Sequence, residues 1–223
     1  RAGVALVVVE AGPPSWLRFP PALPAYRAGE PSAFSGHTRL WWLSSLDKPS
    51  AGPARPAPMQ GWQVVSDHWF GNQLLSLMVP TEAILASAQK RLDARLGDRV
   101  TLRGYGVSTE KQAGDRTGAL EVTLYWQAWQ SLDKDYAVFV HLLDQDGQIA
   151  SQHDGQPAAG GRPTSVWESS EVVVDQHDVP IPKTLKPGLY TLIAGLYDAG
   201  SGERLHDATY QSYISLGQIT LGA

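Results

Sequence analysis

The ten residues LEVTLYWQAW, from Leu120 to Trp129, decide the fold class. Apolar side chains recur at every second position, at Leu120, Val122, Leu124 and Trp126. Because successive side chains of a β-strand point to opposite faces, this alternation predicts a half-buried strand with one face in a core. We expect Trp126 in that core, and Tyr125 and Trp129 on the other, more polar face.

Similar short runs of Val, Leu, Thr, Tyr and Trp lie on both sides of this stretch, separated by Gly, Asp and Pro. We predict seven strands, at Val100–Gly104, Leu120–Trp129, Tyr136–Asp144, Gln148–His153, Glu171–Ile181, Gly188–Asp198 and Tyr213–Leu221. That number of short strands, separated by turn residues, is typical of an antiparallel sandwich. Residues 97–223 are therefore predicted to form an immunoglobulin-like or jelly-roll β-sandwich, and the whole chain to be mostly β.

Residues 1–80 are predicted to form a small α/β unit that includes a Pro-rich loop. Its expected strands are Val4–Val9, Arg39–Leu43, Trp62–Ser66 and Gln73–Val79, the last two joined as a hairpin. The loop is Pro49–Pro58, because proline cannot donate to a strand ladder. Residues 81–96 form a connector, in which Thr81–Arg95 fits either a helix capped by Thr81 or an extended segment.

Composition excludes several classes of protein. Hydrophobic residues make up 43% of the 223 residues and charged residues 18%, which indicates a globular chain with a core. A net charge of -4 without a run of Lys or Arg argues against nucleic acid as a partner. The absence of cysteine removes disulfides, thiolate metal sites and a Cys nucleophile. The longest apolar run, Val4–Val9, is too short to cross a bilayer. Because the sequence starts at Arg1 and not at Met, we expect a segment upstream of it.

A series of motifs follows in order along the chain: LGDRVTLRGY (96–105), LYWQA (124–128), DKDYAVFVHLLD (133–144), QHDGQP (152–157), RPTSVW (162–167), PGLYTL (187–192), GLYD (195–198) and GERL (202–205). This series resembles the C-terminal extracytoplasmic β-sandwich of bacterial, Chloroflexi-like membrane glycosyltransferases of the protein-mannosyltransferase and aminoarabinose-transferase type. Residues 39–43 and 68–71 are similar to a strand and hairpin that precede the sandwich there. One departure is Trp167-Glu-Ser-Ser-Glu171, where the family usually has Pro-Gly after the Trp-acid pair.

The resemblance implies a function outside catalysis. The catalytic carboxylates of that family lie between early membrane helices, a region this sequence does not contain. The implied role is a non-catalytic accessory or recognition module, periplasmic or at the cell surface and membrane-associated. Its expected partners are a membrane protein or membrane-embedded domain, and a glycan or lipid-linked sugar. The alternative is a structural subunit of a cell-envelope or membrane complex, in which the sandwich is a protein–protein interaction domain.

The candidate sugar-binding residues are Tyr125, Trp129 and Trp167, because solvent-facing aromatic rings stack on sugars. Aromatic residues that cover a contact between domains or subunits are the alternative interpretation. Trp167 with Glu168 and Glu171 also fits the carboxylate pair of glycoside chemistry. We favour Trp167 as a plug at the sandwich end and Glu171 as the start of a strand. No catalytic residue is assigned, and we do not expect the chain to be an enzyme by itself.

A metal site is conceivable from composition alone. The residues are His141, His153, His177, Asp154, Asp175 and Asp178, of which only Asp175 and His177 share a strand face by spacing. We favour ordinary polar residues at strand ends, and expect neither a metal nor a cofactor. Residues 144–148, DQDGQ, begin like a calcium loop but lack its later acidic ligand. The Asp-Gly pair instead predicts a hairpin turn.

Overall fold

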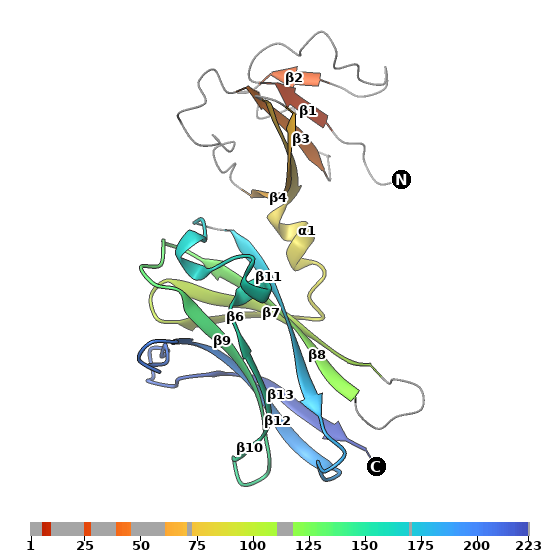
Figure 1. Cartoon of the computed structure of the whole chain (residues 1–223), viewed down its shortest axis with the longest axis vertical. Helices are drawn as coiled ribbons and strands as arrows, with labels where there is room; N and C mark the ends of the chain where they lie inside the picture. Colours follow the sequence, from red (N-terminus) through yellow and green to blue (C-terminus); the bar gives the residue numbers. More distant parts are fainter. Residues whose placement is uncertain are drawn as a thin grey trace. The chain divides into compact units, whose positions relative to one another are not determined.

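The structure is a computed structural model that describes residues 6–9, 25–27, 39–45, 61–70, 73–110, 118–169 and 171–222. The chain divides into two compact units, Arg1–Ile84 and Leu85–Ala223. Strands predominate in both, so the chain is mostly β as predicted (Figure 1). The described residues of the expected α/β unit, 1–80, contain strands and no helix. No helix in the described part of the chain has the length and apolar character needed to cross a membrane. The predicted loop Pro49–Pro58 lies outside the described residues.

The first unit contains a mixed five-stranded sheet in the order β2-β1-β3-β5-β4. Its strands are β1 (Leu6–Val9), β2 (Ala25–Arg27), β3 (Leu40–Ser45), β4 (Trp62–Phe70) and β5 (Gln73–Pro80). Strand β1 runs parallel to β2 and β3, whereas β5 is antiparallel to β3 and β4. The four strands predicted here are confirmed, and residues 71 and 72 of the hairpin turn lie outside the described residues.

Of the two alternatives for Thr81–Arg95, the helix is present only in the first turn, and the extended conformation is found from Lys90 onward. Helix α1 (Thr81–Leu85) is followed by strand β6 (Lys90–Leu96), which pairs antiparallel with the next strand. Along β6, partly buried Leu92 and Ala94 and buried Leu96 alternate with exposed residues, so burial follows a period of two. The sandwich therefore begins within the segment that the sequence assigned to a connector.

The second unit is a sandwich of two four-stranded antiparallel sheets, β11-β8-β7-β6 and β10-β9-β12-β13 (Figure 1). Its further elements are β7 (Val100–Glu110), β8 (Gly118–Ala128), β9 (Tyr136–Leu143), β10 (Ile149–Gly155), η2 (Pro157–Gly160), η3 (Thr164–Val166), β11 (Val172–Ile181), β12 (Gly188–Asp198) and β13 (Ile214–Leu221). All seven predicted strands are confirmed. Without β6, the order matches strands A-B-E and C′-C-F-G of an immunoglobulin-like fold, which decides between the two predicted architectures.

The core lies between the two sheets and follows the alternation of β8. Side chains from three strands form its centre: Leu120, Val122, Leu124 and Trp126 of β8, Val138, Val140 and Leu142 of β9, and Leu192, Ala194 and Leu196 of β12. All are almost completely buried. The Tyr105 hydroxyl donates a hydrogen bond to the carbonyl of Leu216 and so joins the two sheets at a bulge. There Gly217 has a φ of 114°, a conformation that favours glycine.

Gly195 on β12 packs closely against an aromatic ring of the neighbouring strand β9. A Cβ on Gly195 would collide with the Phe139 ring and lie 3.1 Å from the carbonyl oxygen of Ser212. We expect Gly195→Ala to lower the free energy of unfolding by about 1–3 kcal/mol, because the packed ring must move. Urea denaturation measures this change.

Gly188, on the same strand, is the matched control. The nearest atom to a Cβ there is in the Tyr190 ring, 3.9 Å away, which is an ordinary contact. Gly188→Ala should change the free energy of unfolding by no more than about 0.5 kcal/mol. Equal effects of the two substitutions would contradict the close packing of Phe139 on Gly195.

Candidate functional site: the surface around Trp129

The three aromatic candidates have very different exposures. Trp129 is 39% exposed, whereas Tyr125 is 6% and Trp167 is 2% exposed. The predictions that Tyr125 and Trp167 form a sugar platform are therefore corrected, since neither ring can be reached by a ligand. Of the three, Trp129 alone keeps the exposure that stacking requires.

Tyr125 lies on the predicted face of β8, but that face is covered at its position. Its register partner Gly104 has Ala88 packed against the same side, because a Cβ on Gly104 would lie 2.8 Å from the Ala88 Cβ. The segment entering β6 thus crosses this part of the sheet. Burial raises the pKa of the Tyr125 hydroxyl. Strand periodicity did not reveal this cover, which comes from a segment far away in the sequence.

Trp167 is the plug that the sequence favoured. Its Nε1 donates a hydrogen bond of 2.8 Å to the carbonyl of Arg162 in the same loop. The Arg162 guanidinium in turn binds the Glu171 carboxylate, which also accepts a 3.0 Å hydrogen bond from the Glu168 backbone amide. Glu171 therefore clamps the loop before β11 and does not form one half of a reacting carboxylate pair.

Trp129 follows directly after β8, and two hydrogen bonds hold it. Its backbone amide donates 2.8 Å to the carbonyl of Arg99, which extends the pairing with β7. Its ring Nε1 donates 2.8 Å to Oγ1 of the buried Thr101. The ring orientation is thereby set by the sheet, while a large part of the side chain stays open to solvent.

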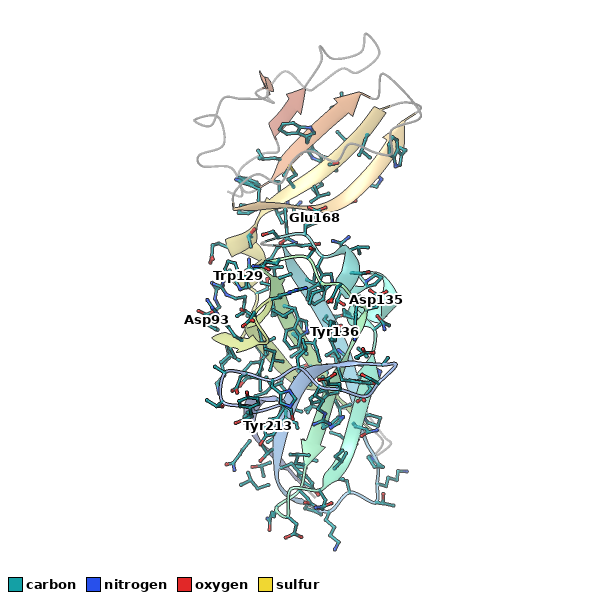
Figure 2. The ribbon with its side chains drawn as sticks, turned by 90° about the vertical axis from the view of Figure 1, so that its left-hand side faces the viewer. Asp93, Trp129, Asp135, Tyr136, Glu168 and Tyr213 are labelled. Carbon is teal, nitrogen blue, oxygen red and sulfur yellow. The ribbon has the colours of Figure 1, made fainter. Side chains whose placement is uncertain are left out.

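Polar side chains surround this ring. The Arg103 guanidinium carbon lies 5.9 Å from the ring centroid, and Arg103 Nη1 donates a 2.7 Å hydrogen bond to Oε1 of Gln127. The Arg103 Nε lies 3.7 Å from Oδ1 of Asp93, a side chain that is 72% exposed. Figure 2 shows Asp93 and Trp129 at the left-hand edge of the sandwich. We call Asp93, Arg103 and Trp129, the members of this group with solvent access, the Trp129 surface; the buried Thr101 and Gln127 hold Trp129 and Arg103 in place through hydrogen bonds.

The Trp129 surface combines the groups that recognise a sugar. An aromatic ring stacks on the apolar face of a pyranose, and charged groups such as those of Arg103 and Asp93 exchange hydrogen bonds with its hydroxyls. The Arg103 guanidinium lies beside the ring and is ion-paired with Asp93, so a charged group is held next to the exposed aromatic side chain. The opposite charges of Arg103 and Asp93 balance, which suits a neutral ligand. Sequence reasoning missed Asp93 because its strand, β6, was assigned to a connector. Arg103 and Gln127 could have been found from the sequence, because each lies two residues from Thr101 or Trp129 and therefore on the same strand face.

The residues considered for a metal fall in separate places. His141 and Asp154 lie on the outer face of the β10-β9-β12-β13 sheet, where His141 Nε2 and Asp154 Oδ1 are 3.0 Å apart. Burial lowers the pKa of His141. Asp178 is exposed on β11. Among the described residues, no group of three or more His, Cys, Asp or Glu side chains is arranged to hold a metal ion.

His153, His177 and Asp175 form a second group of polar side chains, apart from His141 and Asp154. Asp175 and His177 share a strand face, as their spacing predicts, and His177 Nε2 lies 2.8 Å from Asp175 Oδ2. The interpretation as polar residues at strand ends is wrong for His177, which is buried in the middle of β11. The sequence did not predict that His153 meets His177 inside the sandwich.

The turn at residues 144–148 is confirmed. Asp144 Oδ1 accepts hydrogen bonds from the amides of Asp146 and Gln148, at 3.0 and 2.8 Å, and Gly147 has a φ of 74°. The Asp144 carboxylate thus stabilises the hairpin turn through these hydrogen bonds.

No protein-family model and no curated protein matches this chain. A β-glucuronidase from glycoside hydrolase family 2 aligns with 12% identity and a TM-score of 0.36, over 67% of this chain and 18% of that one. An endonuclease/exonuclease/phosphatase from Beutenbergia cavernae DSM 12333 aligns with 13% identity and a TM-score of 0.23, over 72% of this chain and 35% of that one. Similarities at this level carry no argument about function, and this chain spans less than half of either protein.

Proposed function

We propose that this chain is a non-catalytic recognition module of an extracytoplasmic, membrane-associated glycosyltransferase system, and that it binds a glycan or lipid-linked sugar through the Trp129 surface. The resemblance of its motifs supports the context. The observation that carries the binding role is the exposed Trp129 ring, which Thr101 holds in place beside Arg103 and Asp93. A preorganised ring loses little conformational freedom when a sugar stacks on it.

Removal of the ring tests this proposal. We expect Trp129→Ala to weaken glycan binding about tenfold or more, because it removes both the stacking contact and the apolar area that the sugar covers. A glycan array of bacterial envelope sugars identifies a ligand, and isothermal titration calorimetry with that ligand measures the loss. A chain that binds no envelope glycan would contradict the proposal.

Trp69 on β4 is a matched control because it is exposed to a similar degree, 48% against 39% for Trp129. Trp69→Ala removes an equally accessible tryptophan from the other unit and should leave glycan affinity unchanged. An equal loss of affinity in both variants would show that binding depends on exposed aromatic area in general and not on the Trp129 surface.

A second candidate function is the structural subunit, in which the chain docks on a membrane-complex partner. One observation favours it. Strand β4 ends the order of the five-stranded sheet and exposes Val65 and Trp69 at 47% and 48%. An edge strand with exposed apolar side chains is a surface on which a partner strand can pair. Purification from native membranes distinguishes the two functions. If the chain is a structural subunit, it should co-purify with a stoichiometric membrane partner, and Trp69→Ala, but not Trp129→Ala, should release that partner.

A further inference from the structure

Two imidazole rings meet between the two sheets of the sandwich. The Nδ1 atoms of His153 on β10 and His177 on β11 are 2.9 Å apart, and the ring planes make an angle of 73°. Strands β10 and β11 are edge strands of opposite sheets. The Ser151 hydroxyl donates to the carbonyl of Pro180 across the same seam. The pair therefore lies where the two edges close the sandwich.

Asp175 determines which nitrogen of His177 carries hydrogen. The completely buried Asp175 carboxylate lies 2.8 Å from His177 Nε2 and, when ionised, can only accept a hydrogen bond. The hydrogen of a neutral His177 is therefore on Nε2, and the lone pair of its Nδ1 faces His153. With a neutral His177, a hydrogen bond across the 2.9 Å between the two Nδ1 atoms requires His153 Nδ1 as the donor.

This arrangement matches the supporting contacts of a metal-binding histidine. A histidine that binds a metal through one nitrogen usually donates the other N–H to a carboxylate, which fixes the tautomer and the ring orientation. Asp175 does this for His177. If the hydrogen of His153 moves from Nδ1 to Nε2, both Nδ1 atoms carry a free lone pair at a separation of 2.9 Å, and no proton has to leave the protein.

We infer that His153 and His177 form a two-nitrogen site for a divalent cation that accepts square-planar or tetragonal geometry, Cu²⁺ or Ni²⁺. Metal–nitrogen bonds of roughly 2.0–2.1 Å across the 2.9 Å separation correspond to an angle of about 90° at the metal. That angle belongs to square-planar and octahedral geometry, whereas tetrahedral Zn²⁺ would need the nitrogens roughly 3.3 Å apart.

Water completes the coordination sphere, because the described residues place no third His, Cys, Asp or Glu ligand at the pair. His177 is 2% exposed, whereas His153 is partly exposed, so the cation and its water reach the pair from the His153 side of the seam. A site with only two protein ligands binds less tightly than a closed structural site, and exchangeable binding is expected. This inference is independent of the glycan-binding proposal.

Calorimetric titration of the untagged chain with Cu²⁺, Ni²⁺ and Zn²⁺ tests the site. We expect one Cu²⁺ per chain, and Ni²⁺ bound more tightly than Zn²⁺. His153→Gln removes one ligand at the partly exposed position and should weaken Cu²⁺ binding at least tenfold. His206→Gln, at an exposed histidine of the loop before β13, is the matched control and should bind as the unaltered chain does.

Magnetic resonance of the unaltered chain gives a readout that does not depend on a variant's folding. The Cu²⁺ spectrum should show coupling to two imidazole nitrogens, and Ni²⁺ should broaden the ring signals of His153 and His177 before those of His141. No binding, affinity unchanged by His153→Gln, Zn²⁺ bound more tightly than Ni²⁺, or broadening centred on His141 would each overturn the assignment.

Discussion

Replacement of Asp175 by alanine is expected to lower the free energy of unfolding by about 3–5 kcal/mol. The carboxylate is completely buried and accepts three hydrogen bonds, from His177 Nε2 at 2.8 Å, the Ala158 amide at 2.9 Å and Trp126 Nε1 at 3.3 Å. Alanine leaves all three donors without a partner, and each buried unsatisfied donor costs about 1–3 kcal/mol. The shift of the urea denaturation midpoint measures the loss.

Asp178 on the same strand is the matched control, because it has the same carboxylate but points to solvent. Asp178→Ala should change the free energy of unfolding by no more than about 0.5 kcal/mol. A small effect at Asp175, or effects of similar size at both positions, would contradict the role of the buried carboxylate as the common acceptor.

The Asp175→Ala substitution also has a local consequence in η2. Ala158 and Ala159 both have a φ of 52°, a left-handed conformation that is uncommon for alanine. The hydrogen bond from the Ala158 amide to Asp175 helps to hold this strained turn. In Asp175→Ala, the Ala158 amide should therefore exchange its hydrogen faster than amides in the centre of β8, which hydrogen-exchange mass spectrometry resolves.

The second large effect is expected at Trp167. Trp167→Ala should lower the free energy of unfolding by about 3–5 kcal/mol, because it leaves a cavity at a side chain that is 2% exposed. It also removes the donor to the Arg162 carbonyl and so loosens the loop that Glu171 clamps. Urea denaturation measures the loss.

The adjacent Val166 is 50% exposed and serves as the control for Trp167. Val166→Ala should have an effect within about 0.5 kcal/mol. A Trp167→Ala variant that keeps full stability but loses glycan binding would contradict the plug and restore Trp167 as a sugar platform. The two interpretations therefore separate in one pair of measurements.

The strands of the sandwich were predictable because their signal is local. The apolar residues of β8 alternate with a period of two, and the core contains the side chains that this alternation selects. Strand β6 was missed for a related reason. Ile84, Ala88 and Leu92 are spaced four apart and fit a helix, while Leu92, Ala94 and Leu96 fit a strand period of two, and each pattern has only three apolar positions. Pairing with β7 decides between the two periods.

The candidate site was predictable only in part. Strand parity placed Tyr125 and Trp129 on one face, but it carries no information on what covers that face. The segment at Ala88 covers the sheet at Tyr125, and Trp129 lies beyond β8 beside Arg103. Arg103 reaches the ring from β7, and Asp93 on β6 is ion-paired with Arg103. Their participation depends on the register of β6 and β7, which no local pattern specifies.

The sequence by itself therefore determined the class of fold, most strand positions and the turns, because alternation, proline and Asp-Gly act on neighbouring residues. Only the tertiary structure decided which aromatic ring stays exposed, that Asp175 is a buried acceptor, and that His153 and His177 meet. These outcomes join residues that are distant along the chain, and they depend on how strands pair and how two sheets close on each other. Long-range packing, and not composition, produced both candidate sites.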